Sequence, residues 1–423
     1  MELKFIQMSD IHFQKSSNDS FDEDVDIREG AVLDISTEAK RVLGTIDGVL
    51  VCGDIAYSAQ PNEYDHAKEF LKGIVDIFDK EMSDIYCVPG NHDVNQSDIR
   101  RSMYILDAQS ILEETAYHDS SQIENELRRI MESPGSKDIL LAPLENYQNE
   151  FAGELFCKHT ADKLYWDSVF SLGDYKLLLQ GMNSVYISSH LDHKDKDGNP
   201  RSEERKMVMN PRQIPSVKEK TIYLSMCHHP PECWIDQSMS ERIDHRVMIQ
   251  LYGHKHWQTI EEKDNRLRIY SGALQPERNG QDWKPQYNWI VLEICGDELQ
   301  IKIYPRIYEE QSGKFVADTS ICDEREIYKL CRLSLCNSNY DELRGKDDVQ
   351  KQENPKEEEY IMDNVMRNII YKMMRLNGAR LHELNKMYSD SGLDFTNQDI
   401  DAVVKWLHDK GNEDEFWKTI RRL

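Results

Sequence analysis

Short apolar segments, each followed by polar residues of types that bind metals, recur along the first two-thirds of the chain. Apolar runs of this length, bounded by Gly, Pro or Asp, are typical of buried strands. The polar residues therefore fall where strands end and loops begin, so that several strand ends can converge on one point. The five predicted strands are Leu3–Met8, Val49–Cys52, Ile85–Val88, Thr221–Cys227 and Val247–Tyr252.

The polar residues after these strands form a set of seven potential metal ligands. Two aspartates, one asparagine and four histidines make a mixed oxygen and imidazole set, which suits divalent ions such as Mn, Fe, Zn, Co or Ni. Seven ligands are too many for one tetrahedral ion. They suit two ions about 3.5–4 Å apart that share a carboxylate. The expected ligands are Asp10, His12, Asp54, Asn91, His228, His254 and His256.

Helical spacing of apolar residues predicts a helix over Glu63–Phe78 and a helical insertion over about residues 97–160. The expected helices of the insertion are Ile99–Leu112, Gln122–Met131 and Leu144–Phe156. We expect the insertion to lie over the metal site or to supply an interaction surface.

The remaining strands follow the insertion. Val169–Leu172 and Tyr175–Gln180 predict a hairpin around Gly173. Three later strands are expected to close a second sheet: Leu267–Tyr270, Trp289–Ile294 and Leu299–Tyr304. The polar residues 190–206 predict a solvated loop, in which His190, Asp192 and His193 resemble a metal site but lack further ligands.

The C-terminal part divides into a charged linker over 337–358 and a small helical module over 359–423. The module is expected either to pack on the main domain, which spans 1–336, or to dock a protein partner or a second copy of the chain. The charge of the linker favours some independence of the module.

The formal net charge of −25, from 77 acidic and 52 basic residues, disfavours a protein that coats nucleic acid. It does not exclude a nucleic-acid substrate, because bound cations offset local negative charge. The apolar runs are too short to span a bilayer. The N-terminus shows no secretion signal, and the nine cysteines are scattered, so we expect a cytoplasmic protein with reduced thiols and no membrane contact.

The ordered motifs resemble those of the calcineurin-like metallophosphoesterase superfamily. They are Asp10-Ile11-His12, Gly53-Asp54, Gly90-Asn91-His92-Asp93, His228-His229-Pro230 and Gly253-His254-Lys255-His256. Any one of them is weak evidence, whereas the five in order are specific. The resemblance covers about three-quarters of the chain. It implies an α/β (α+β) fold, a four-layer αββα sandwich of two mixed β-sheets flanked by helices.

The resemblance also implies roles for single residues. Asp10, His12, Asp54 and His256 would hold one ion, and Asp54, Asn91, His228 and His254 the other, so that Asp54 bridges the two. His92 would contact the phosphoryl group or protonate the leaving group, with Asp93 orienting its imidazole.

Other interpretations of these residues stay open. Asp93 could instead cap a helix that begins at Asn95, and Asn91 could be a turn residue. His229 competes with His228 for one ligand place, and the family pattern favours His228. Tyr57, Lys255 and Arg278 could contact substrate, but we expect ordinary surface residues at these positions.

The function that the resemblance implies is hydrolysis of a phosphate ester by a metal-bridging hydroxide. A phosphodiester of a nucleotide or nucleic acid, including a nuclease substrate, is the first expectation, because the insertion and the tail suggest a larger substrate or a protein partner. A phosphomonoesterase is the second, and a scaffold protein with a gated site is the third. Mn is the expected metal, with Fe or Zn as alternatives.

Overall fold

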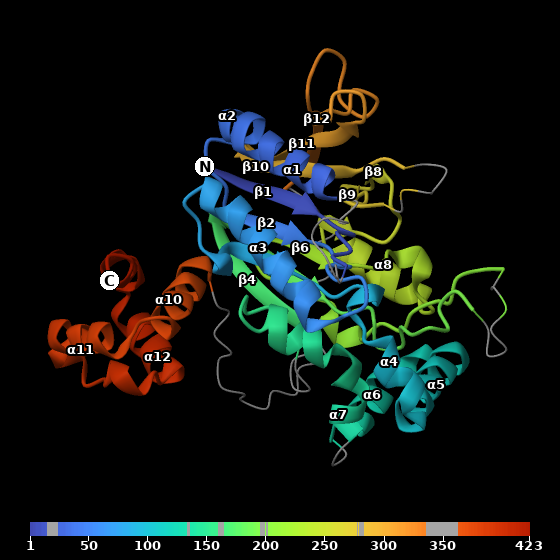
Figure 1. The fold of residues 1–423 in the computed structure, drawn as a ribbon, viewed down its shortest axis with the longest axis horizontal. Coiled ribbons are helices and arrows are strands. Elements are labelled where there is room, and N and C mark those ends of the chain that lie inside the picture. The colour runs from blue at the N-terminus through green and yellow to red at the C-terminus, as the bar shows by residue number, and fades with distance from the viewer. Residues whose placement is uncertain are drawn as a thin grey trace.

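Two β-sheets form the centre of the molecule in this computed structural model (Figure 1), which describes residues 1–14, 24–132, 136–159, 165–194, 199, 202–276, 278, 283–335 and 363–423. The first sheet has the order β12-β11-β10-β1-β2-β3, with β13 also paired to β11. Its strands are β1 (Glu2–Met8), β2 (Gly48–Val51), β3 (Ile85–Cys87), β10 (Gln286–Cys295), β11 (Glu298–Glu309), β12 (Lys314–Ala317) and β13 (Lys329–Ser334).

The second sheet has the order β4-β5-β6-β7-β9-β8. Its strands are β4 (Tyr165–Leu172), β5 (Tyr175–Met182), β6 (Thr221–Cys227), β7 (Ile249–Tyr252), β8 (Gln258–Lys263) and β9 (Arg266–Ser271). The predicted hairpin is confirmed, since β4 and β5 pair antiparallel around Gly173, whose φ is +61°. Both sheets are mixed, as the resemblance implied.

Parallel pairing brings the strand ends that carry the motifs to one edge of each sheet. In the first sheet β1, β2 and β3 are parallel neighbours, and in the second sheet β6 lies parallel to β7. Ligands of α/β sheets bind outside the carboxyl ends of parallel strands. The five motif loops begin at these carboxyl ends.

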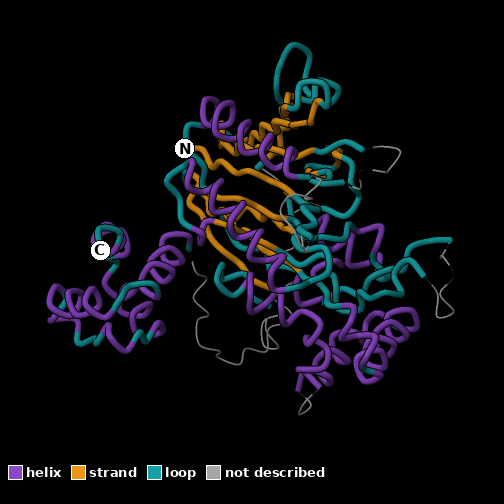
Figure 2. Tube along the Cα trace, in the orientation of Figure 1, coloured by secondary structure: helices purple, strands orange, loops and turns teal. Residues whose placement is uncertain are grey.

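The sheets pack face to face, and helices cover their outer sides (Figure 2). Phe5 of β1 meets Phe170 of β4 edge to face, with ring centroids 5.4 Å apart, across the layer between the sheets. The helices on the first sheet are α1 (Val25–Asp34), α2 (Lys40–Leu43) and α3 (Pro61–Ile77). On the second sheet, α8 (Gln237–Arg246) buries Met239 and Ile243 among residues of β5, β6 and β7.

One expectation about the sheets is wrong. Trp289–Ile294 and Leu299–Tyr304 lie in β10 and β11, which extend the first sheet through antiparallel pairing of β10 with β1. Only Leu267–Tyr270, in β9, belongs to the second sheet. The local apolar pattern specifies a strand, but it carries no information about which distant strand will pair with it.

The helical insertion forms a separate layer beside the end of the sandwich that carries the motifs. Its helices are α4 (Gln96–Arg101), α5 (Met103–His118), α6 (Ile123–Glu132) and α7 (Ser136–Leu141), followed by a π-helical turn at Tyr147–Ala152. Leu112, Leu127 and Ile130 form an apolar cluster with Tyr186 and Ile187 from the segment after β5. The insertion is therefore packed on the segment that joins β5 to β6.

The C-terminal helices have an apolar core of their own and also dock on the main domain. They are α10 (Asn364–Met374), α11 (Gly378–Met387), α12 (Ile400–Lys410) and α13 (Glu413–Ile420). Arg367 of α10 is buried and donates hydrogen bonds to the carbonyl oxygens of Ser83, Ile85 and Leu155. The first helix of the module thus packs on the main domain beside β3. The expected linker, 337–358, lies outside the described residues.

Candidate metal centre

The motif loops hold an unusual backbone conformation. Asp10, His12, Asp54, His254 and His256 all have φ between 52° and 67°, in the left-handed region. Side-chain-bearing residues adopt this region at a cost of order 1–3 kcal/mol each, and such strain gathers at functional sites. Five of the seven expected ligands therefore lie in strained turns that the surrounding structure holds in place.

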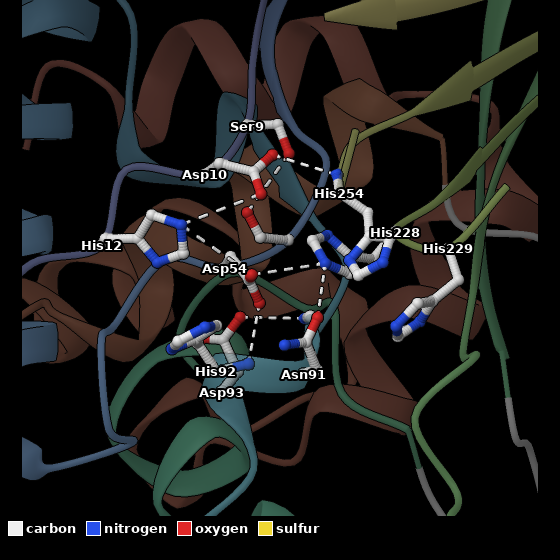
Figure 3. Close-up of polar contacts among 12 residues, drawn as sticks. Ser9, Asp10, His12, Asp54, Asn91, His92, Asp93, His228, His229 and His254 are labelled. Carbon is white, nitrogen blue, oxygen red and sulfur yellow. Dashed lines mark hydrogen bonds and ion pairs between the residues drawn. The ribbon is translucent and has the colours of Figure 1, made fainter. Parts of the chain in front are cut away.

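Backbone hydrogen bonds join the first two loops. The amides of Ile11 and His12 donate to the carbonyl oxygen of Asp54, at 2.9 and 3.0 Å. The amide of Asp10 donates to the carbonyl oxygen of Gly53 at 3.0 Å. The loops after β1 and β2 are thereby fixed to each other, and the side chains of Asp10, His12 and Asp54 face one point (Figure 3).

One group of potential ligands surrounds Asp10. Oδ1 of Asp10 lies 3.3 Å from Nε2 of His256 and 3.9 Å from Nε2 of His12. His12 Nε2 also lies 4.0 Å from Oδ2 of Asp54. The Asp10 side chain is fully buried, and Oδ1 has no hydrogen-bond partner among the described residues. A cation among these atoms would satisfy this oxygen.

A second group shares Asp54 with the first. Nε2 of His228 lies 3.4 Å from Oδ2 of Asp54 and 3.0 Å from Oδ1 of Asn91. Nδ1 of His228 lies 2.9 Å from the carbonyl oxygen of Cys52, which can only accept, so the proton is on Nδ1. The lone pair of Nε2 then faces two oxygen acceptors. This arrangement is repulsive unless a proton or a cation lies between them.

The pKa shifts of His228 and Asp10 show that the buried carboxylates of the site favour positive charge beside them. Burial opposes a charged imidazole at His228, yet the Asp54 carboxylate outweighs it and raises the pKa of His228 to about 9. At Asp10, burial favours the neutral acid, but His256 and His228 lower its pKa to about 2. At His12, burial together with His92 lowers the pKa to about 4. The donor types, their burial and the His228 tautomer with its lone pair on Nε2 all fit divalent cations.

The loop after β3 places His92 beside this centre. Its backbone amide donates to Oδ1 of Asp54 at 2.8 Å, and Nδ1 of its ring lies 2.8 Å from the carbonyl oxygen of Tyr57. Because that carbonyl only accepts, Nδ1 carries a proton and Nε2 is left for another partner. The rings of His92 and His12 are 4.7 Å apart.

The Asp93 carboxylate has partners other than the His92 imidazole, so its expected role in orienting that ring stays a prediction, whereas the alternative that Asp93 caps the next helix is wrong. The Asp93 carboxylate accepts hydrogen bonds from the amides of Gly90, Ile55 and Ala56 and from the Tyr64 hydroxyl. Asn95 caps α4 instead. Burial beside the Asp54 charge raises the pKa of Asp93 to about 7. Its contacts tie the second motif loop to the third.

Two glycines of the motifs are explained by close approach. A Cβ atom on Gly90 would lie 2.1 Å from Oδ1 of Asp54, and one on Gly253 would lie 2.0 Å from Oγ of Ser9. Contacts this short do not occur between nonbonded atoms, so any larger residue would push the ligand loops apart. The Gly residues in GNHD and GHxH therefore allow the loops to converge.

The fourth motif places two histidines in the centre. His229 is buried, Nδ1 lies 2.9 Å from the Ser184 hydroxyl, and Nε2 has no hydrogen-bond partner among the described residues. Its ring lies 4.4 Å from that of His254. His228, rather than His229, faces Asp54 and Asn91.

The structure adds one residue that the sequence patterns did not single out. Oε1 of Glu204 lies 2.8 Å from Nε2 of His254. Glu204 comes from the polar loop between β5 and β6, where no periodicity or motif distinguishes it from other glutamates. Only the folded arrangement of this loop beside the fifth motif identifies it.

The possible substrate-contacting residues divide into two kinds. Lys255 and Arg278 are ion-paired: Nζ of Lys255 lies 2.5 Å from Glu232, and Arg278 lies 2.8 Å from Asp24. Tyr57 is exposed beside the centre, with its ring 5.3 Å from that of His92. The side chains of Lys255 and Arg278 thus form the ion pairs expected of surface residues.

A scan against protein families matches residues 3–258 to the calcineurin-like phosphoesterase family. The chain belongs to this family. The side-chain clusters described above are candidate sites for the divalent ions that this family typically binds. The two mixed sheets flanked by helices agree with this assignment.

Known proteins similar to this calcineurin-like phosphoesterase include an uncharacterized metallophosphoesterase-like protein, YydB, of Bacillus subtilis (strain 168). It is 24% identical over 316 residues, which are 72% of this chain and 60% of the relative, so the chain spans less than two-thirds of that protein. Among solved structures, purple acid phosphatase PPD1 of yellow lupin has 12% identity and a TM-score of 0.38, covering 79% of this chain and 54% of its own.

A third similar protein is a putative 5'-nucleotidase of Staphylococcus aureus, with 13% identity and a TM-score of 0.34, covering 82% of this chain and 58% of its own. Among the described residues of the phosphoesterase, no helix combines the length and the apolar character that crossing a membrane requires.

Proposed function

We propose that this calcineurin-like phosphoesterase is a phosphodiesterase with two divalent ions, Mn²⁺ by preference, that share the Asp54 carboxylate. The observation that carries the proposal is the position of Asp54 Oδ2 between two groups of ligand atoms, 4.0 Å from His12 Nε2 and 3.4 Å from His228 Nε2. Asp10, His12 and His256 would complete one ion site. Asn91, His228 and His254 would complete the other.

The ions, when bound, would supply positive charge to the phosphoryl oxygens and make a water nucleophilic at neutral pH. The chain itself contributes His92, whose Nδ1 proton is directed at the Tyr57 carbonyl and whose Nε2 is left to act on the substrate. A nitrogen of His92 lies within 4.8 Å of ligand atoms of His12 and Asp54. This proximity to the ligand atoms supports a role of His92 in contacting the phosphoryl group or the leaving-group oxygen of a substrate held by the ions.

Charge favours a diester over a monoester. A phosphate monoester is a dianion near neutral pH, whereas a diester carries one negative charge. The cationic side chains that the sequence offers for substrate contact, Lys255 and Arg278, are both paired with carboxylates. Apart from the ions, neither of these side chains is left to bind the second negative charge of a monoester, which favours a diester, and exposed Tyr57 beside His92 offers a surface for a nucleoside.

The proposal is tested by hydrolysis of bis-p-nitrophenyl phosphate and of p-nitrophenyl phosphate with added Mn²⁺. We expect preference for the diester, and loss of at least about 10²-fold in kcat on His92→Ala and of more on Asp54→Ala. His382→Ala, an exposed histidine of α11, is the matched control and should leave kcat unchanged. Preference for the monoester, or full activity of Asp54→Ala, would contradict the proposal.

A further inference from the structure

The ring of His254 is held by a side chain, unlike that of His228. Nε2 of His228 is directed inward because the backbone carbonyl of Cys52 binds Nδ1. At His254, Oε1 of Glu204 lies 2.8 Å from Nε2. A carboxylate offers no proton of its own, so at this distance Nε2 carries the proton, and the neutral imidazole has its lone pair on Nδ1. Histidines that bind metals commonly donate their second ring N–H to a carboxylate in this way.

We propose that Glu204 is a positioning residue of the metal centre, which fixes the tautomer and the orientation of His254 so that Nδ1 faces the ion. The inference rests on the proposed function, because it takes His254 to be a ligand. It adds a residue outside the five motifs and a structural reason for the long segment between β5 and β6. Glu204 does not contact the substrate in this account.

The position of Glu204 depends on the helical insertion. The next residue, Arg205, is buried, and its guanidinium donates to both carboxylate oxygens of Glu113 on α5, at 2.9 and 2.5 Å. Arg205 also donates to the carbonyl oxygen of Ile187 at 2.7 Å, and lies 3.6 Å from Asp192. These contacts fix the backbone directly beside Glu204.

A continuous set of contacts therefore joins the insertion to the metal ligand. Glu113 holds Arg205, Arg205 fixes the loop, and Glu204 holds the ring of His254. The inference predicts that a change at Glu113, on the insertion, weakens metal binding at the His254 site in the same direction as a change at Glu204, but by less. A purely structural role of Arg205 would predict no selective effect on one ion.

The experiment is calorimetric titration of the metal-free full chain with Mn²⁺, for the wild type and for Glu204→Ala, Glu204→Gln and Glu113→Gln. We expect the wild type to bind two ions and Glu204→Ala to bind one of them about 10–100-fold more weakly. Glu204→Gln keeps an acceptor oxygen for Nε2, so it should recover part of the loss. Glu203→Gln, on the neighbouring exposed glutamate, is the matched control and should match the wild type.

The outcomes separate the inference from the proposed function. Two ions of unchanged affinity in Glu204→Ala would overturn the inference and leave the metal centre standing. A wild type that binds no ion would overturn both. Glu204, Cys233 and His254 also place ligand atoms within 4.8 Å of one another. A third ion that is lost in both Glu204→Ala and Cys233→Ser would therefore make Glu204 a ligand itself, which would also overturn the positioning role. Unfolding of each metal-free variant in urea identifies any that fail to fold.

Discussion

Arg367 offers the sharpest test of how the C-terminal helices are joined to the main domain. It lies almost fully buried, with its guanidinium 4.3 Å from the Tyr86 ring centroid. Nη2 donates to the carbonyl oxygens of Ser83 and Ile85 at 3.2 Å each, and to that of Leu155. Arg367→Met keeps most of the side-chain volume but leaves three buried carbonyl oxygens without this donor.

The expected cost follows from these contacts. A buried acceptor left without its partner costs about 1–3 kcal/mol, and release of the guanidinium from a buried site returns part of this. For three carbonyl oxygens we expect a net loss of about 3–5 kcal/mol in the free energy of unfolding.

Urea unfolding followed by circular dichroism measures this loss. Arg375→Met, at the C-cap of the same helix, is the matched control, because Arg375 is half-exposed, pairs with Glu154 at 3.2 Å and lies over the Tyr371 ring. Such pairs contribute at most about 1 kcal/mol. Equal effects of the two substitutions, both below about 1 kcal/mol, would refute the reasoning and show that α10 is not fixed by Arg367.

Three further predictions concern the centre and its surroundings. Gly90→Ala should weaken Mn²⁺ binding at least about 10-fold, since its Cβ would lie 2.1 Å from Asp54 Oδ1. Gly73→Ala in α3, where the new Cβ meets no atom within 4 Å, should leave Mn²⁺ binding intact and add about 0.5–1 kcal/mol to the free energy of unfolding. Calorimetry measures the binding and urea unfolding the stability, and equal Mn²⁺ binding by both variants would refute the explanation. Burial, opposed by Arg205, raises the pKa of Asp192 to about 7. Its contribution to stability is therefore full below the unfolded pKa of about 4 and is lost as pH rises through about 7. Between pH 5 and pH 8, Asp192→Asn should lose less stability than the wild type by about 3 kcal/mol; identical losses would contradict this. Removal of ions with EDTA should lower the Tm of the wild type, and Mn²⁺ at about 100 times Kd should restore about 2.7 kcal/mol; a Tm indifferent to both, in differential scanning fluorimetry, would count against ion binding.

Much of this site could be predicted from the sequence because its residues follow strands directly. β1, β2, β3, β6 and β7 have clear apolar patterns, and parallel pairing brings their ends together. The role of Asp93 could not be read in this way, because its partners are backbone amides of another loop. Nor could the pairing of β10 with β1, since the two strands are remote in sequence.

Two buried contacts also escaped the sequence patterns. Glu204 lies in a polar segment that resembles any solvated loop, and its contact with His254 depends on how the insertion holds that segment. Arg367 lies on a helix whose apolar spacing describes only the face that packs within the module. A charged residue that is buried by a second surface gives no periodic signal.

The most direct test of the central claim is anomalous diffraction from crystals of the full chain grown with Mn²⁺. The account predicts two Mn peaks about 3.5–4 Å apart, one on each side of Asp54 Oδ2, with Asp10, His12 and His256 around one and Asn91, His228 and His254 around the other. A single peak, or peaks away from Asp54, would contradict it.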